Sequence, residues 1–293
     1  MTMYEYLMNV PHILIGGTPG SGKSVLLNGI ICDLMRTHSV DDTRFYLIDP
    51  KAVELYPYSK TLFCDGYTEE AEDVPSLLDD LIEEMTRRYA DMRDRDIKDY
   101  DGGSIYLIID ELPDLMISDY AVEIRKKLQR ILAKGRASKI HVIAATQAPN
   151  RITIPASLVL NFTDRIALRC VSPIESRQLI NVSGAEKLPR YGKGLYLSAK
   201  GIEEISIPLT TDADVKEVCT KFSKPTAKPV SVESHVEVKP LSMRKVLLTF
   251  LAFLLSIPFG IPQFSIAILF VIVIELFSMT SAINACEKAN SPR

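Results

Sequence analysis

The chain has 293 residues, of which 24% are charged, and a formal net charge of −3. Its length allows one core of about 200 residues plus an appendage, and its near-neutral charge excludes recruitment of nucleic acid by a global basic field. The five cysteines are scattered without a C-x-x-C pair, which argues against a zinc site or a disulfide framework and indicates a reducing compartment.

Residues 17–24 fit the phosphate-loop pattern G-x-x-x-x-G-K-[ST] at every fixed position. An apolar run at 12–16 precedes the loop as a predicted buried strand, and 25–31 follow it as a predicted helix. Glycines let backbone N–H groups approach phosphate oxygens, and the helix N-terminus adds partial positive charge. Lys23 is expected to reach the β- and γ-phosphates and Ser24 to bind Mg²⁺. The expected nucleotide-binding residues are Gly17, Thr18, Pro19, Gly20, Ser21, Gly22, Lys23 and Ser24.

Strands and helices then alternate, which predicts an α/β fold with a mainly parallel sheet flanked by helices. Residues 44–49 read as a second strand and 61–64 as a short third. From 74 to 93, apolar residues recur at helical spacing. The charged face of this helix, which includes Arg87 and Arg88, is interpreted as a solvated face, with a subunit contact as the alternative.

A second nucleotide signal follows the Gly102-Gly103 break. Residues 105–109 are apolar and lead directly into Asp110 and Glu111. A strand here would place Asp110 at its carboxyl end to hold Mg²⁺ through water, with Glu111 polarising the attacking water. Taken alone, the pattern also fits a buried strand that runs into an acidic turn. Together with the phosphate loop, it favours the catalytic interpretation.

Residues 121–134 read as a helix and 140–147 as a strand that brings Gln147 to the same sheet edge as the phosphate loop. A polar side chain there can sense the γ-phosphate and signal to the following loop. An ordinary glutamine at the end of a strand is the alternative. Segments 164–170 and 194–198 complete the predicted sheet.

At this point the sequence resembles the FtsK/SpoIIIE family of ring-forming ATPases that pump DNA. The resemblance covers roughly residues 10 to 210 and consists of many short matches in the right order. The matching stretches are 11–16, 49–51 with 54–55, 87–89, 109–112 with 114–116, 133–141, 145–147, 165–167, 176–177 and 184–188.

The resemblance implies a RecA-like fold assembled as a homo-oligomer, a hexameric ring. It also implies ATP with Mg²⁺ bound between neighbouring subunits and double-stranded DNA in the pore. Arg136 corresponds to the arginine that reaches into the neighbour's site, where such a residue neutralises charge on the γ-phosphoryl group. From the residues alone, Arg136 is a cation between a helix and a strand, and a surface arginine is the alternative. Arg177 corresponds to a position that faces DNA.

Two departures from the family bear on DNA binding. Ala148 stands where the family usually has an arginine, and Pro173 stands where it usually has a lysine. Each lost phosphate contact lowers affinity and the salt slope by about one counterion, so we expect weaker DNA binding than in a typical member. Arg151, Arg169 and Lys193 could compensate.

The sequence begins almost on the first predicted strand and lacks the winged helix that some relatives carry at the other end. We therefore expect either a minimal ring or a partner subunit that supplies the upstream domain.

The motor domain is expected to span 1–220, followed by a linker rich in Pro, Lys and Ser at 221–243 and a transmembrane helical segment at 244–283, with a polar tail at 284–293. The uncharged stretch 246–274 is longer than the roughly 20 residues that one span needs. A helical hairpin and a single kinked span both fit. Basic residues on both flanks favour the hairpin. A buried core helix pair is the soluble alternative.

The expected function is that of a membrane-tethered ring ATPase that moves double-stranded DNA, with its motor facing the cytoplasm, as in conjugation, phage or plasmid maintenance, or chromosome segregation. A coupling ATPase for protein export is the second hypothesis, and the two absent cations favour it. A membrane scaffold in which ATP binding only controls assembly is the third.

Overall fold

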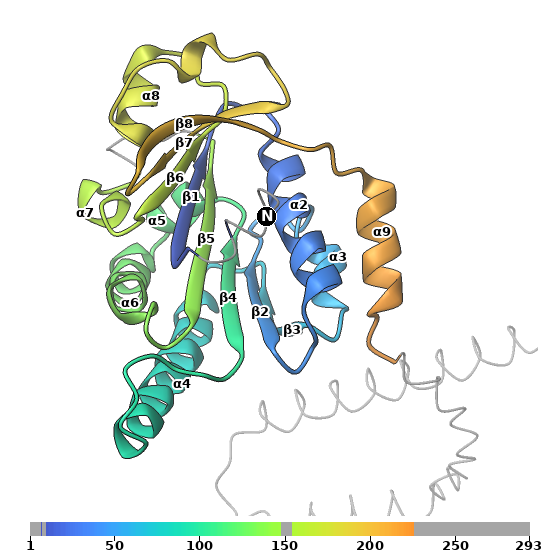
Figure 1. The fold of residues 1–293 in the computed structure, drawn as a ribbon, viewed down its shortest axis with the longest axis vertical. Helices are drawn as coiled ribbons and strands as arrows, with labels where there is room; N and C mark the ends of the chain where they lie inside the picture. The colour runs from blue at the N-terminus through green and yellow to red at the C-terminus, as the bar shows by residue number, and fades with distance from the viewer. Residues whose placement is uncertain (1–6, 8–9, 148–153, 226–293) are drawn as a thin grey trace, which may run out of the picture. The chain divides into compact units, whose positions relative to one another are not determined.

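The described residues, which are 7, 10–147 and 154–225 of this computed structural model, are organised around an eight-stranded sheet (Figure 1). Its order is β3-β2-β4-β5-β1-β6-β7-β8, parallel from β3 to β6, with β7 and β8 antiparallel. The predicted α/β class with a mainly parallel sheet is therefore confirmed. The strands are β1 (His12–Gly16), β2 (Thr43–Ile48), β3 (Cys64–Thr68), β4 (Ser104–Ile109), β5 (Ile140–Thr146), β6 (Asp164–Ala167), β7 (Lys193–Ser198) and β8 (Gly201–Ser206).

Helices cover both faces of the sheet, because successive residues of the central strands point their apolar side chains in opposite directions. On one face, Leu14 of β1 joins the core formed with α4, α5, α6, α7 and α8. On the other face, Ile13 and Ile15 join the core formed with α2, α3 and α9. These helices are α2 (Lys23–Thr37), α3 (Tyr56–Ser59), α4 (Val74–Asp94), α5 (Leu112–Met116), α6 (Ala121–Lys134), α7 (Ala156–Val159), α8 (Pro173–Ile180) and α9 (Asp212–Lys221).

The third strand lies further along the chain than predicted. Residues 61–64 form a turn, in which Thr61 N donates to Tyr58 O at 3.0 Å and Cys64 N donates to Thr61 O at 3.1 Å. Phe63 is buried because its ring stacks on Phe45 at 5.4 Å. The apolar run therefore marks a core contact, and the more polar 64–68 form the strand.

Most of the charged face of α4 is exposed as expected, Glu84 is half-buried, and one residue is buried. Arg88 is 5% exposed, so the prediction of a solvated face is wrong at this position. Its guanidinium is directed toward backbone carbonyls beyond α4 and has left the solvent for that reason.

Pro173, one of the two departures from the family pattern, begins α8. Ser172 caps this helix by accepting a hydrogen bond from Glu175 N at 3.3 Å. Proline suits the first turn because that N–H has no partner within the helix. Pro173 thus suits the start of the helix, and the lysine that the family usually has at this position is absent.

The last described elements cover the outer parts of the sheet. β8 reads GIEEIS, is almost wholly exposed, and gives no burial pattern from which it could be predicted. α9 begins with a capping box between Thr211 and Asp214. Beyond it, Lys224 N donates to Lys60 O at 2.9 Å, so the chain runs past the turn that precedes β3.

None of the helices in the described ranges combines the length and apolar character that crossing a bilayer demands. The rest of the predicted linker, 226–243, the predicted transmembrane segment at 244–283 and the tail at 284–293 lie outside the described residues.

Removal of a central core side chain provides a test of this fold. Ile108 of β4 is fully buried, so Ile108→Ala should lower the free energy of unfolding by about 2–5 kcal/mol. Urea denaturation monitored by circular dichroism would measure the change. As a control, Val122→Ala on exposed α6 should shift it by no more than about 0.5 kcal/mol. Equal effects of the two substitutions would contradict the placement of β4 at the core.

Candidate active site

The phosphate loop joins the carboxyl end of β1 to the first residue of α2. Gly20 and Gly22 adopt φ values of 71° and 99°, where a residue with a side chain is strained. Lys23 folds back over this turn, and its Nζ donates to Gly17 O at 2.7 Å and to Thr18 O at 3.1 Å. The ammonium group therefore lies within the loop that the sequence predicts as the phosphate cradle.

Neighbouring segments fix the loop in place. Thr18 donates to Arg169 O through its backbone N at 2.9 Å and through its Oγ1 at 3.1 Å. Gly17 N donates to Thr146 O at the end of β5, at 3.2 Å. At the rim, a Cβ placed on Gly20 would lie 3.0 Å from Nη2 of Arg190. The loop is thus held by the strands on both sides of β1, with a guanidinium beside it.

The predicted pair of acids follows β4 at the same edge of the sheet. Asp110 and Glu111 are both buried. Glu111 Oε1 accepts a hydrogen bond from Gln147 N at 3.0 Å, and its Oε2 lies 3.3 Å from Lys51 Nζ. Burial lowers the pKa of Lys23, while the charges of Glu111 and Asp110 act to raise it. The structure therefore brings together Lys23, Asp110, Glu111 and the backbone of Gln147.

Asp110 lies in a strongly negative environment. Burial, followed by the charges of Asp49 and Glu54, raises the pKa of Asp110 to about 6. The ionised carboxylate is consequently unfavourable in the protein alone. A divalent cation next to it would remove this penalty, because it adds positive charge where three carboxylates converge.

Three further residues belong to the site, although sequence reasoning gave them no role. Lys51 pairs with Glu111. Glu54 Oε1 accepts a hydrogen bond from Ser24 Oγ at 2.6 Å. Asp49 Oδ2 accepts from Leu55 N at 2.8 Å. Their position just after β2, the neighbour of β4 in the sheet, is the signal that could have indicated them.

These residues fit a magnesium ion bound together with a nucleotide. Ser24 Oγ and the Asp110 carboxylate are oxygen ligands of the kind that Mg²⁺ prefers. Asp49 Oδ1 is buried without a hydrogen-bond partner in the described ranges. Within those ranges, no three His, Cys, Asp or Glu side chains group into a self-contained metal site.

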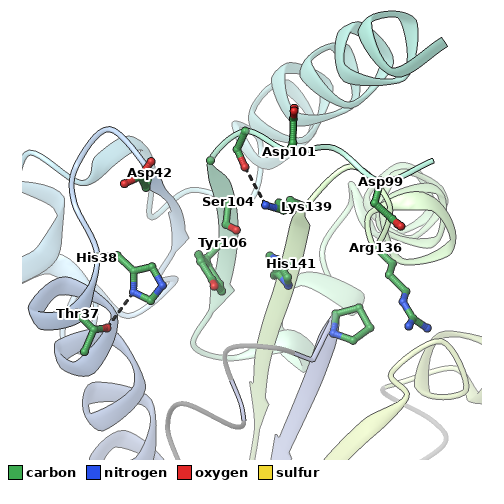
Figure 2. A pocket seen from close by; sticks show the side chains of 13 residues that line it. Thr37, His38, Asp42, Asp99, Asp101, Ser104, Tyr106, Arg136, Lys139 and His141 are labelled. Atoms are coloured by element: carbon green, nitrogen blue, oxygen red, sulfur yellow. Dashed lines mark hydrogen bonds between the residues drawn. The ribbon is translucent and has the colours of Figure 1, made fainter. Parts of the chain in front are cut away.

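Arg136 lies at the opposite edge of the sheet. It follows α6 and precedes β5, and Figure 2 shows it on the wall of a cavity of about 830 Å³. β5 has seven residues, which places its two ends about 20 Å apart. Arg136 is exposed, and it does not belong to the cluster around Lys23 of its own chain.

Arg177 lies on α8, where it is exposed and lines a cavity of about 190 Å³ together with Leu14 and Ile154. Ala148 and Arg151 fall in the segment 148–153, outside the described residues. Arg169 lies just beyond β6, and its carbonyl anchors the phosphate loop. Lys193 begins β7 and pairs with Glu204 at 2.9 Å, which partly neutralises it.

Comparison with known proteins agrees with this geometry. The FtsK/SpoIIIE family pattern matches residues 2–202, which is more than half of the chain. The chain belongs to the FtsK/SpoIIIE family. The resemblance inferred from the short motifs is thereby confirmed.

Relatives of this family member include the DNA translocase FtsK of Chlorobaculum tepidum, with 37% identity over 66% of this chain and 26% of that protein. Another is the DNA translocase SftA of Bacillus subtilis, with 35% identity over 65% of this chain and 22% of that protein. The chain thus matches about a quarter of the length of these relatives.

Solved structures share the fold. The pCW3 conjugation coupling protein TcpA, determined with ATPγS, superposes with a TM-score of 0.65 at 23% identity, covering 73% of this chain and 66% of that one. The cytoplasmic domain of the type VII secretion ATPase EccC from Thermomonospora curvata gives 0.62 at 23% identity, covering 73% of this chain and 28% of that one. At this level of identity, the comparison establishes a common architecture.

The raised pKa of Asp110 predicts that this carboxyl makes a pH-dependent contribution to the free energy of unfolding. Its folded value of about 6 lies above the ordinary 3.8, so the folded state retains the proton that the unfolded chain has lost. The contribution of Asp110 to the free energy of unfolding should therefore fall as pH rises from about 4 to 7, by roughly 1–2 kcal/mol after allowance for solvent screening. Asp110→Asn should not show this decrease.

Urea denaturation in the presence of a chelator, at several pH values, would give the difference between wild type and Asp110→Asn. Asp94→Asn, at the exposed end of α4, is the control and should follow the wild type. If the difference between wild type and Asp110→Asn did not change with pH, the negative environment assigned to Asp110 would be wrong.

Proposed function

We propose that the chain is the motor part of a membrane-tethered ring ATPase that translocates double-stranded DNA. One observation carries the proposal: Lys23, Asp110 and Glu111 meet at one edge of the sheet, while Arg136 is exposed at the opposite edge. A site divided in this way is complete only when two copies of the chain adjoin.

ATP is the expected nucleotide, with its phosphates over the glycine turn and Lys23 turned from the loop carbonyls toward them. Mg²⁺ would supply positive charge between the β- and γ-phosphates, with Ser24 and Asp110 as its protein ligands. The Glu111 carboxylate is held by the backbone N–H of Gln147 at Oε1 and by Lys51 at Oε2. Held in this way, the carboxylate would orient the attacking water. The side chain of Gln147 would report the γ-phosphate to the residues that follow.

Arg136 is proposed to complete the neighbouring subunit's site. It is too far from its own phosphate loop to act there, and no described residue forms an ion pair with it. An arginine that enters an adjacent site typically contributes 10³ to 10⁵ in rate. We propose a hexameric ring as the assembly that places every Arg136 beside a neighbour's Lys23.

The proposed polymer is double-stranded DNA, because the relatives in this family are named as DNA translocases. Arg177 is exposed and available for a phosphate contact. Ala148 and Pro173 each remove a cation that the family usually has, so DNA affinity is proposed to be modest and strongly salt-dependent.

The membrane anchor is proposed from the sequence of 244–283, with the motor on the cytoplasmic side. The uncharged stretch and its basic flanks support it.

Protein export is the second candidate. The observation that favours it is Pro173, the first residue of α8. Because proline stands here, this part of the surface lacks the lysine that the family usually has. Crosslinking in cells to a protein substrate, with none to DNA, would select this function. A scaffold that only binds ATP would instead retain its function with Glu111→Gln.

The catalytic assignment is tested by ATPase assays with and without duplex DNA at low salt. Lys23→Ala should abolish turnover. Arg136→Ala should lower kcat by about 10³-fold or more while nucleotide binding is retained. Lys126→Ala, an equal charge change on the exposed face of α6, is the control and should match the wild type. A failure of DNA to stimulate the wild type would argue against DNA as the substrate.

DNA contact by Arg177 predicts a change in salt dependence. Arg177→Ala should weaken duplex binding for all sequences and reduce the slope of log affinity against log salt by about one. Fluorescence anisotropy across a salt series would measure it, with Arg130→Ala on α6 as the matched control. An unchanged slope would remove Arg177 from the DNA-binding surface.

A further inference from the structure

The loop that carries Arg136 is a tight turn formed by residues 135–139. Ile140 N donates to Gly135 O at 2.9 Å, and Lys139 N donates to Arg136 O at 3.2 Å. A Cβ on Gly135 would lie 2.3 Å from Ile140 O, so a larger residue cannot be accommodated without moving the turn. The backbone on both sides of Arg136 is therefore closely constrained.

Arg88 ties this turn to α4. Its Nη1 donates to Ser138 O at 2.7 Å, to Gly103 O at 2.9 Å and to Lys139 O at 3.4 Å. One buried guanidinium thus joins the turn before β5 to the segment before β4. Three separate chain segments meet at this side chain.

Two further contacts fix the guanidinium itself. Its Nε donates to Glu84 Oε1 at 2.7 Å, one helical turn earlier on α4. The Tyr100 ring lies 4.5 Å from its Cζ, and Tyr100 N donates to Ala137 O at 2.8 Å. The buried positive charge is compensated by Glu84, and Tyr100 binds the same turn from its other side.

The side chain of Arg136 has no comparable support. It is exposed on the cavity wall, and its guanidinium has no hydrogen-bond or ion-pair partner among the described residues (Figure 2). Its position in space therefore depends on the backbone from which it extends. Misplacement by about 1 Å can cost a catalytic group 10²-fold in rate.

We propose that Arg88 is a positioning residue that holds the 135–139 turn so that Arg136 enters the adjoining subunit's site, an inference that rests on the proposed function of Arg136. Arg88 acts through backbone carbonyls and touches no reacting atom. Lysine cannot replace it, because an ammonium group lacks the planar fork that also holds Glu84.

The defect of an Arg88 variant should therefore appear in the neighbour's site and not in its own. Full-length Arg88→Ala alone should lose about 10²-fold in kcat, with little change in KM for ATP. Mixed with Lys23→Ala, it should regain activity, because the Lys23→Ala subunit still offers a well-placed Arg136 to the intact site of the Arg88→Ala subunit. A role confined to folding of its own subunit would give no such rescue.

A mixture of Lys23→Ala with Arg136→Ala gives the reference level of rescue. With random mixing, roughly a quarter of the interfaces join an intact Lys23 site to an intact Arg136. If that mixture shows no rescue, Arg136 does not act in the adjoining site, and both the proposed function and the role of Arg88 are wrong. If it is rescued while Lys23→Ala with the Arg88 variant is not, only the role of Arg88 is wrong.

Circular dichroism and thermal unfolding establish that each variant is folded. Arg88→Lys keeps the charge and most of the stem, and it decides the question if Arg88→Ala does not fold. Arg93→Ala is the matched control, because Arg93 is an exposed arginine of the same helix that pairs with Asp94. Its activity should stay within about twofold of the wild type.

Discussion

Repulsion among carboxylates at one edge of the sheet is the constraint on which the rest of the site depends. Asp49, Glu54, Asp110 and Glu111 converge there, and burial, followed by the charges of Asp49 and Glu54, raises the pKa of Asp110. The positive charges of Lys23 and Lys51 offset part of this repulsion. Burial acts to lower the pKa of Lys51, but the charges of Glu111, Asp114 and Asp110 outweigh it, so the pKa of Lys51 is raised. The arrangement stores negative charge that a nucleotide-bound metal ion can neutralise.

A parallel sheet explains how this concentration arises. β1, β5, β4 and β2 are neighbours, and all four deliver their carboxyl ends to the same edge. The phosphate loop, Gln147, the two acids and Lys51 follow these strands directly. The loops at the opposite edge are then left for Arg136. Strand direction alone therefore places Arg136 about 20 Å from the residues around Lys23 of its own chain.

Much of this could be predicted from sequence. The phosphate loop and the Asp110-Glu111 pair are short sequence motifs with fixed residue types and spacing. The strands that precede them are continuous apolar runs, which indicate burial. Lys51 and Glu54 match the family pattern, but the sequence assigns them no role. Single charged residues in a loop show no hydrophobic periodicity, and their partners Glu111 and Ser24 are distant in sequence. The same limit applies to Arg88, whose helical spacing predicts exposure while its carbonyl partners come from other segments. The predicted position of the third strand is wrong because the apolar run around Phe63 makes an aromatic core contact and forms no strand. β8 has no buried face from which it could be predicted.

The outer strand β8 bears on how copies of the chain can meet. Glu203 and Glu204 stand next to each other on this exposed border strand, and at the other border the run from Phe222 to Lys224 lies against the turn before β3. Unpaired strand borders invite intermolecular sheet growth, and acidic side chains on such a border discourage it. Association by sheet extension through β8 is therefore disfavoured, which limits fibrous aggregation along this border at high local concentration.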